Sequence, residues 1–397
     1  MGSTKHSGRV VKSRTALAAL LAAVCSLLLP GASRAGDTDW IVLPHASASG
    51  RMLLHALRDN GKPVSTDIRL DKGGKIWSLR IGNNKSGFTF AGINYCGVAV
   101  LATGGDPTRD KNPRYNKRLY NGPNAVNLIL RNCRTAEQAV DLLRDGAKKS
   151  LIYGSLIFFI ADPNRAFIVE CSHRHFAVSE LTKGFCVYTN VWKLPGMDDA
   201  SARSPKFHSW QFQREWTTAE MLRRARGDGK ISLAESLATS RVGVLEINAP
   251  AFEKARDKWR INNTPAIRTS ADGVLFEIDR EFPGVLSCAY VAFGPPRHTV
   301  YLPIPIGAAE KLPAELTPNP WKAGALARNK AAKPDTPIDM RFATFEKRIF
   351  TEFEKAREEA RTLLRDKKVD DAKKVLQDAL QRHAAEAAAE FGKAAQE

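Results

Sequence analysis

Two neighbouring residues near the start of the chain, Asp37 and Thr38, carry side chains that could attack an acyl group. When a nucleophile stands on the first residue of a mature chain, the α-amino group of that residue can act as its base. Threonine suits this chemistry, but Thr38 would have to be N-terminal. A carboxylate is a poor nucleophile toward an unactivated amide, because it is the better leaving group and the adduct collapses backwards. The segment therefore predicts a catalyst that is altered, or one that has lost its nucleophile.

The identity of the first mature residue depends on a leader that we assign to residues 1–35. Its first part is basic, residues 15–29 are almost wholly apolar, and Pro30-Gly31 follows before small residues up to Ala35. This order is typical of a secretory signal cleaved after Ala35, and an uncleaved anchor is the alternative. We expect the protein to be exported, periplasmic or extracellular, with Gly36 as its first residue.

Strands, two helices, strands, two helices and strands follow one another along the chain. Alternating or continuous apolar runs predict the strands, and spacings of three and four residues predict the helices. The expected strands are residues 40–43, 51–55, 75–81, 88–93, 96–102, 155–161, 166–171, 185–189, 275–278, 287–293 and 299–304. The expected helices are residues 124–130, 135–144, 216–224 and 232–240. This order favours an α+β fold with antiparallel sheets covered by helices.

Six short segments in sequence order carry a resemblance to a known family. They are the hairpin with Thr38, Ala46-Ser47, Gly50 and Asp59, and then residues 92–100, 132–139, 160–170, 188–190 and 293–303. Together they resemble the N-terminal nucleophile hydrolases of the choloylglycine hydrolase, penicillin acyltransferase and dipeptidase type. The resemblance covers roughly residues 37 to 307.

This resemblance implies a four-layer αββα sandwich that hydrolyses or transfers an acyl group at an amide bond, without a cofactor. A first-residue nucleophile attacks the carbonyl, its amine moves the proton, and an Asn side chain stabilises the oxyanion. Asp59 matches the acidic partner of the terminal amine, and Asn190 matches the oxyanion residue. Asn94 and Trp192 are predicted to contact a small amide or acyl substrate.

The chain departs from the family pattern at the positions where catalysis would take place. Asp37 stands in place of the nucleophilic Cys, Ala56 in place of an Arg, and Leu57 in place of the Asn after it. Tyr95 replaces a Glu, and Val191 replaces a His. Two hypotheses follow, namely an amide hydrolase or acyltransferase with an altered nucleophile, and a silent relative that binds a ligand or partner. Processing that makes Thr38 N-terminal would favour the enzyme, although Thr38 is more simply the second residue of the family.

We place the hydrolase-like domain at residues 36–310, and further segments follow it. A linker rich in Pro, Ala and Lys is expected at 311–338, followed by an amphipathic helical hairpin at 339–397. Apolar residues recur there at helical spacing, which predicts packing on the core or contact with a second copy or a partner.

Composition excludes several other functions. The net charge is +18, but the basic residues are spread among acids and no nucleic-acid motif is present, so we expect no nucleic-acid partner. No membrane span is expected after the leader. Cys96, Cys133, Cys171, Cys186 and Cys288 follow the leader; one or two disulfides are possible, but small buried side chains are the simpler interpretation. His173 and His175 would share one face of a strand, yet spacing supplies no third ligand, so no metal is expected.

Overall fold

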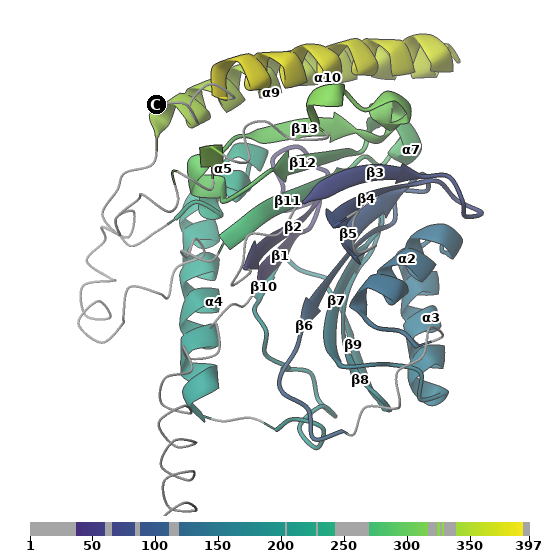
Figure 1. Ribbon diagram of the computed structural model, residues 1–397, viewed down its shortest axis with the longest axis vertical. Helices are drawn as coiled ribbons and strands as arrows, with labels where there is room; N and C mark the ends of the chain where they lie inside the picture. The colour runs from purple at the N-terminus through teal and green to yellow at the C-terminus, as the bar shows by residue number, and fades with distance from the viewer. Residues whose placement is uncertain are drawn as a thin grey trace, which may run out of the picture. The chain divides into compact units, whose positions relative to one another are not determined.

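Two antiparallel sheets form the centre of the fold in a computed structural model (Figure 1). It describes residues 37–59, 66–83, 88–110, 119–202, 205–227, 229–242, 270–316, 324, 325, 328 and 339–391. The predicted leader and most of the predicted linker lie outside these residues. The first sheet has the order β10-β1-β2-β11-β12-β13. Its strands are β1 (Thr38–Val42), β2 (Met52–Asp59), β10 (Phe185–Tyr188), β11 (Ser270–Ile278), β12 (Cys288–Ala292) and β13 (Tyr301–Pro305).

The second sheet runs in sequence order from β3 to β9, with every neighbouring pair antiparallel. Its strands are β3 (Asp67–Asp71), β4 (Ser78–Asn83), β5 (Phe88–Asn94), β6 (Ala99–Gly104), β7 (Ser155–Ala161), β8 (Ala166–Ser172) and β9 (His175–Glu180). Both faces of its central strands are buried. In β7, Ile157 and Phe159 belong to the core shared with the first sheet, whereas Phe158 and Ile160 belong to the core under the helices. The continuous apolar run of β7 follows from this double burial.

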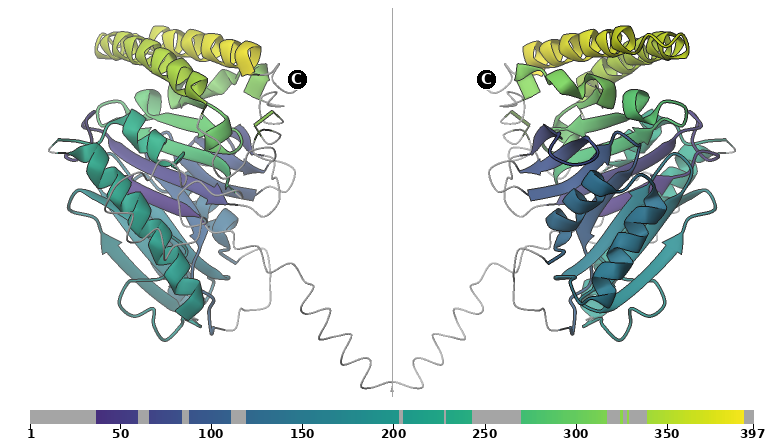
Figure 2. Two further views of the ribbon diagram at one scale, coloured as in Figure 1. Left: turned by 90° about the vertical axis from the view of Figure 1, so that its left-hand side faces the viewer. Right: turned by 90° about the vertical axis from the view of Figure 1, so that its right-hand side faces the viewer.

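Helices cover the outer faces of both sheets, which completes four layers and confirms the predicted α+β sandwich (Figures 1 and 2). On the second sheet lie α2 (Gly122–Asn132) and α3 (Ala136–Lys148). The helix α3 begins after its predicted cap Thr135, whereas α2 begins two residues before the expected position 124, because the Asn121 side chain caps its first turn. On the first sheet lie α4 (Pro205–Arg226) and α5 (Leu233–Thr239), with a short α7 (Pro283–Leu286) next to β12.

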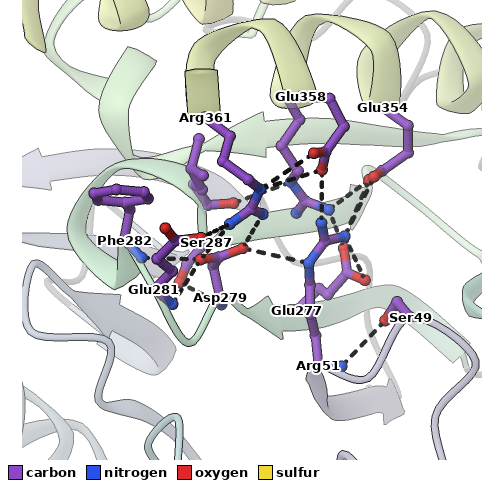
Figure 3. A network of polar contacts seen from close by, with 12 residues as sticks. Ser49, Arg51, Glu277, Asp279, Glu281, Phe282, Ser287, Glu354, Glu358 and Arg361 are labelled. Carbon is purple, nitrogen blue, oxygen red and sulfur yellow. Dashed lines mark hydrogen bonds and ion pairs between the residues drawn. The ribbon is translucent and has the colours of Figure 1, made fainter. Parts of the chain in front are cut away.

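The C-terminal helices α9 (Met340–Arg365) and α10 (Val369–Phe391) pack on each other and on β13. Their apolar faces are buried in the core of the same chain, as the aromatic contacts of Phe353 and Phe391 show. Buried ion pairs fasten α9 to the first sheet. Arg357 Nη1 lies 2.6 Å from Glu277 Oε2. Arg361 Nη2 lies 2.6 Å from Asp279 Oδ2 (Figure 3). The apolar stripe is therefore used within the chain, and self-association through other faces stays a prediction.

Some elements differ from the expectation. The strands β3 and β9 were not predicted, and α4 begins eleven residues before the expected position 216. The predicted strand at 96–102 starts only at Ala99, because Cys96 and Gly97 form the turn from β5. All five cysteines after the leader are free thiols, and three of them are buried. No described helix combines the length and the apolar character needed to cross a bilayer.

Candidate functional site

Asp37 lies just before β1, at the boundary between the two sheets. Side chains alternate along a strand, so Asp37 and Asp39 share one face of β1 while Thr38 and Trp40 share the other. Trp40 stacks on His55 and donates to Ser236 of α5, which places its face toward the helical layer. Asp37 instead contacts Thr103 of the opposite sheet. Asp37 and Asp39 therefore face the space between the sheets, and Thr38 faces away from it.

The carboxylate of Asp37 is bonded through both of its oxygens. Its Oδ2 accepts from the Thr103 hydroxyl at 2.6 Å, and its Oδ1 accepts from the backbone N–H of Asp59 at 2.9 Å. The guanidinium of Arg214, on α4, donates to the Asp37 carbonyl. The side chain and the backbone of residue 37 are thus held by three different elements.

Asn190 is connected to Asp37 through Thr103, which is hydrogen-bonded to both residues. Its Nδ2 donates to Thr103 Oγ1 at 3.0 Å and to the Gly104 carbonyl at 2.8 Å. Its Oδ1 has no hydrogen-bond partner in the described part of the chain. An oxyanion donor must point an N–H group toward the developing negative charge. Here both amide hydrogens of Asn190 are directed to protein oxygens.

Asp59 joins the cluster at the end of β2. Its Oδ2 lies 2.5 Å from Arg214 Nη1, and its Oδ1 accepts from Ser270 at 2.7 Å. Both side chains of the Asp59–Arg214 pair have no solvent exposure. Thus the structure brings together Asp37, Asp59 and Asn190, and we call this group with its contacting residues the Asp37 cluster. It adds Arg214 and Thr103, which no sequence spacing indicated, and Asp39, which alternation with Asp37 could have revealed.

The cluster is rich in carboxyl groups whose charge is costly to bury. Burial raises the pKa of Asp37 above its usual value, although Thr103, the Asp59 N–H and two arginines oppose this shift. Burial, with the nearby charges of Asp37 and Asp59, raises the pKa of Asp39 much further. Burial also raises the pKa of Asp59 to about 7, despite Arg214. The site thus holds protons at a pH where exposed carboxyls are ionised.

The raised pKa of Asp59 predicts an inverted pH dependence of stability. The folded protein keeps the proton up to about pH 7, whereas the unfolded chain releases it near 3.8. Folding is therefore favoured at low pH, and this contribution declines from about pH 4 to 7 with a slope of up to about 1.4 kcal/mol per pH unit. Urea unfolding across this range, with Asp59→Asn as reference, isolates the contribution. If the free energy of unfolding of the native chain, relative to that of Asp59→Asn, rose with pH, the expectation would be contradicted.

Asn94 and Trp192, the predicted substrate contacts, lie in the interior. The Asn94 Nδ2 donates to the carbonyls of Leu130 and Cys133, and its Oδ1 accepts from the N–H groups of Cys96 and Val98. Trp192 is buried, and its Nε1 donates to the Leu156 carbonyl. These bonds give Asn94 the task of fastening the β5–β6 turn to the end of α2.

Replacement of Asn94 by alanine should therefore affect stability and leave ligand binding unchanged. The variant leaves two carbonyls and two N–H groups without their partner, at a cost of about 2 kcal/mol. Chemical denaturation measures the loss, and calorimetric titration with an acyl amide measures binding. Weaker binding at unchanged stability would instead restore Asn94 as a substrate contact.

The histidine pair does not form the predicted shared face. His173 lies in the turn between β8 and β9, and His175 begins β9. Asp110 Oδ2 accepts from Ser172 at 2.7 Å and from His175 Nδ1 at 2.9 Å. The carboxylate thus stands between the hydroxyl and the imidazole, an order that does not activate the serine as a nucleophile. Among the described residues, no group of three or more His, Cys, Asp or Glu side chains is placed to bind a metal.

Solved structures with a partial likeness to this chain were found, all at low sequence identity. Penicillin V acylase from Agrobacterium tumefaciens is 15% identical, with 68% of this chain and 86% of that chain covered and a TM-score of 0.37. The Caenorhabditis elegans ortholog of N-acylethanolamine-hydrolyzing acid amidase is 11% identical, with 62% and 93% covered and a TM-score of 0.40. A variant of conjugated bile acid hydrolase from Clostridium perfringens is 10% identical, with 68% and 92% covered and a TM-score of 0.42. No protein-family model and no curated protein matches the chain.

All three TM-scores are below 0.5 and all three identities are 15% or less. These likenesses therefore carry no argument about the activity of the chain. What the chain does has to be argued from the contacts of its own residues.

Proposed function

We propose that this chain is an exported protein with the scaffold of an acyl-amide hydrolase, which binds a small acyl-amide ligand and does not turn it over through residue 37. The single observation that supports this most is the state of the Asp37 carboxylate. Both oxygens accept hydrogen bonds from the protein, and residue 37 is also fixed through its carbonyl. Such a group serves as an anchor for the start of β1.

Two further features argue against nucleophilic catalysis. The hydrogens of the Asn190 amide are used within the protein, and the loss of one oxyanion donor typically costs about 10² to 10³ in rate. Cleavage after Ala35 would leave Gly36 as the first residue, so the free amine would not belong to residue 37. Thr38 gains no support as a substitute nucleophile, because its side chain is buried on the opposite face of β1.

A second candidate function uses the acids themselves. Asp37 and Asp39 lie on one face of β1, burial raises the pKa of both, and that of Asp39 is raised more. A protonated carboxyl beside an ionised one can act as acid and base toward a water molecule. In this alternative the chain is a hydrolase with a changed mechanism, and Asp37→Asn would abolish its activity.

Titration of N-acyl amides into the mature native chain tests the proposal. Calorimetry should detect binding, while chromatography of the same mixture after a long incubation should recover the amide intact. Release of the amine by the native chain, lost in Asp37→Asn, would replace the proposal by the acid–base alternative. Neither binding nor release would reject an acyl-amide ligand altogether.

A further inference from the structure

A cavity of about 340 Å³ lies at the opposite end of β6 from the Asp37 cluster. Its walls come from the segment before β4, the β5–β6 turn, the start of α3 and the helix α10. Thr103 contacts Asp37 near the end of β6, and Cys96 lines the cavity before the strand begins. The extended part of the chain between them, from Ala99 to Thr103 in β6, alone spans about 13 Å. The cavity is thus a separate site.

The lining of this cavity is positively charged. Lys75, Arg134 and Lys373 line it, and none of the residues described as lining it is a carboxylate. Nearby, Glu310 lies 3.4 Å from Lys373 Nζ and 4.0 Å from Lys72 Nζ, so that one acid serves two lysines. The excess of cations favours an anionic occupant.

Two aromatic rings stand at the same cavity. Trp77 and Tyr95 line it and remain 40% and 41% exposed, which is unusual for such large side chains in a core-forming segment. The Tyr95 ring lies against Gly284, where an added Cβ would come within 2.9 Å of it. This close packing holds the ring in place before any ligand binds. Exposed rings of this kind supply flat surfaces for stacking.

We propose that this cavity, the Trp77–Tyr95 site, binds a small ligand in which a ring with an apolar face carries an anionic group. The ring would stack on Trp77 or Tyr95, and the anion would lie among Lys75, Arg134 and Lys373. The volume is at the lower end of the range for small-molecule sites, which suits one ring with its substituent. Aryl phosphates and sugar phosphates share this chemistry.

Cys96 provides a reporter inside the site. It is a free, half-buried thiol that lines the cavity, with Arg134 Nη1 at 4.0 Å from its sulfur. Cys186, a half-buried thiol of β10 in the other sheet, serves as an internal reference. Alkylation by iodoacetamide, resolved by peptide mass spectrometry, compares both thiols in the native mature chain. Phenyl phosphate, glucose 6-phosphate and inorganic phosphate are the probes.

At least one ring-bearing phosphate should slow alkylation of Cys96 about tenfold at nine times its dissociation constant, with Cys186 unchanged. Protection of Cys96 by phenyl phosphate or by glucose 6-phosphate identifies the kind of ring that the site accepts. Protection by neither would overturn the proposal, as would equal protection by inorganic phosphate, which would mean a general anion effect. The Asp37 cluster is untouched, so this result does not depend on the proposed function.

Variants around the cavity, with a matched control in α10, show which side chains are responsible for the protection of Cys96. Lys373→Ala and Arg134→Ala should each raise the dissociation constant obtained from protection about tenfold, because a charge-assisted contact is lost. Lys374→Ala removes the next lysine, whose side chain is 75% exposed, and should change nothing. Trp77→Ala or Tyr95→Ala, whichever removes the stacking ring, should abolish the advantage of a ring-bearing phosphate over inorganic phosphate. A Lys374→Ala effect equal to that of Lys373→Ala would overturn the site.

Discussion

Replacement of Arg214 by alanine is expected to lower the free energy of unfolding by about 3–5 kcal/mol, the usual cost of breaking a buried ion pair by removing one partner. Arg214 bridges α4 to the first sheet through the carboxylate of Asp59 and the carbonyl of Asp37. Without it, buried carboxyl groups lose their cation. They should then take up protons, so the loss should be smaller at pH 5 than at pH 8. Urea denaturation at both values measures it.

Arg223→Ala, in the same helix, is the matched control. Arg223 pairs with Glu220 at 2.9 Å, but its side chain is 54% exposed. Exposed pairs typically contribute less than about 1 kcal/mol. If Arg214→Ala and Arg223→Ala lowered stability equally, the buried pair would not hold the start of β1 as we describe.

Restoring the missing side chains should create amidase activity. A mature chain that begins at residue 37 and carries Asp37→Cys with Ala56→Arg places a thiol next to a free amine and adds the guanidinium at its family position. We expect release of the amine from simple acyl amides at least about 100-fold above the native chain, since loss of a nucleophile can cost about 10⁶ in kcat. The Asn190 contacts would keep the rate below that of an evolved enzyme.

Two controls keep this result interpretable. The same double variant with Gly36 retained has its amine on the wrong residue and should stay inactive. Ala56 is only 5% exposed, so Asp37→Cys alone is measured beside the double variant, and circular dichroism checks that both are folded. Folded variants without activity would show that the scaffold lacks more than the nucleophile and the arginine.

Sequence patterns predicted the architecture because most strands are buried on at least one face. The missed strand β3 has the polar sequence Asp67–Asp71 and lies at a sheet edge, where hydrophobic alternation is weak. The missed β9, also at an edge, is half polar. In α4, aromatic residues in the first half obscured helical spacing, so the predicted helix began at Trp216.

The site was predicted only as far as local patterns reach. Asp37, Asp59 and Asn190 could be placed by motif, and the structure brings them within one network of hydrogen bonds. Arg214 lies 177 residues from Asp37 in sequence, and nothing in α4 distinguishes it from the arginines near its end. The amide hydrogens of Asn190 are bonded to Thr103 and Gly104 of the opposite sheet. Sequence alone does not reveal these contacts.

The most direct measurement is a turnover assay of the native mature chain, with its first residue read from the intact mass. We predict a chain that starts at Gly36 and leaves bound N-acyl amides uncleaved over a day. A native chain that begins at residue 37 or 38 and releases the amine, with activity lost in Asp37→Asn or Thr38→Ala, would contradict the loss of catalysis.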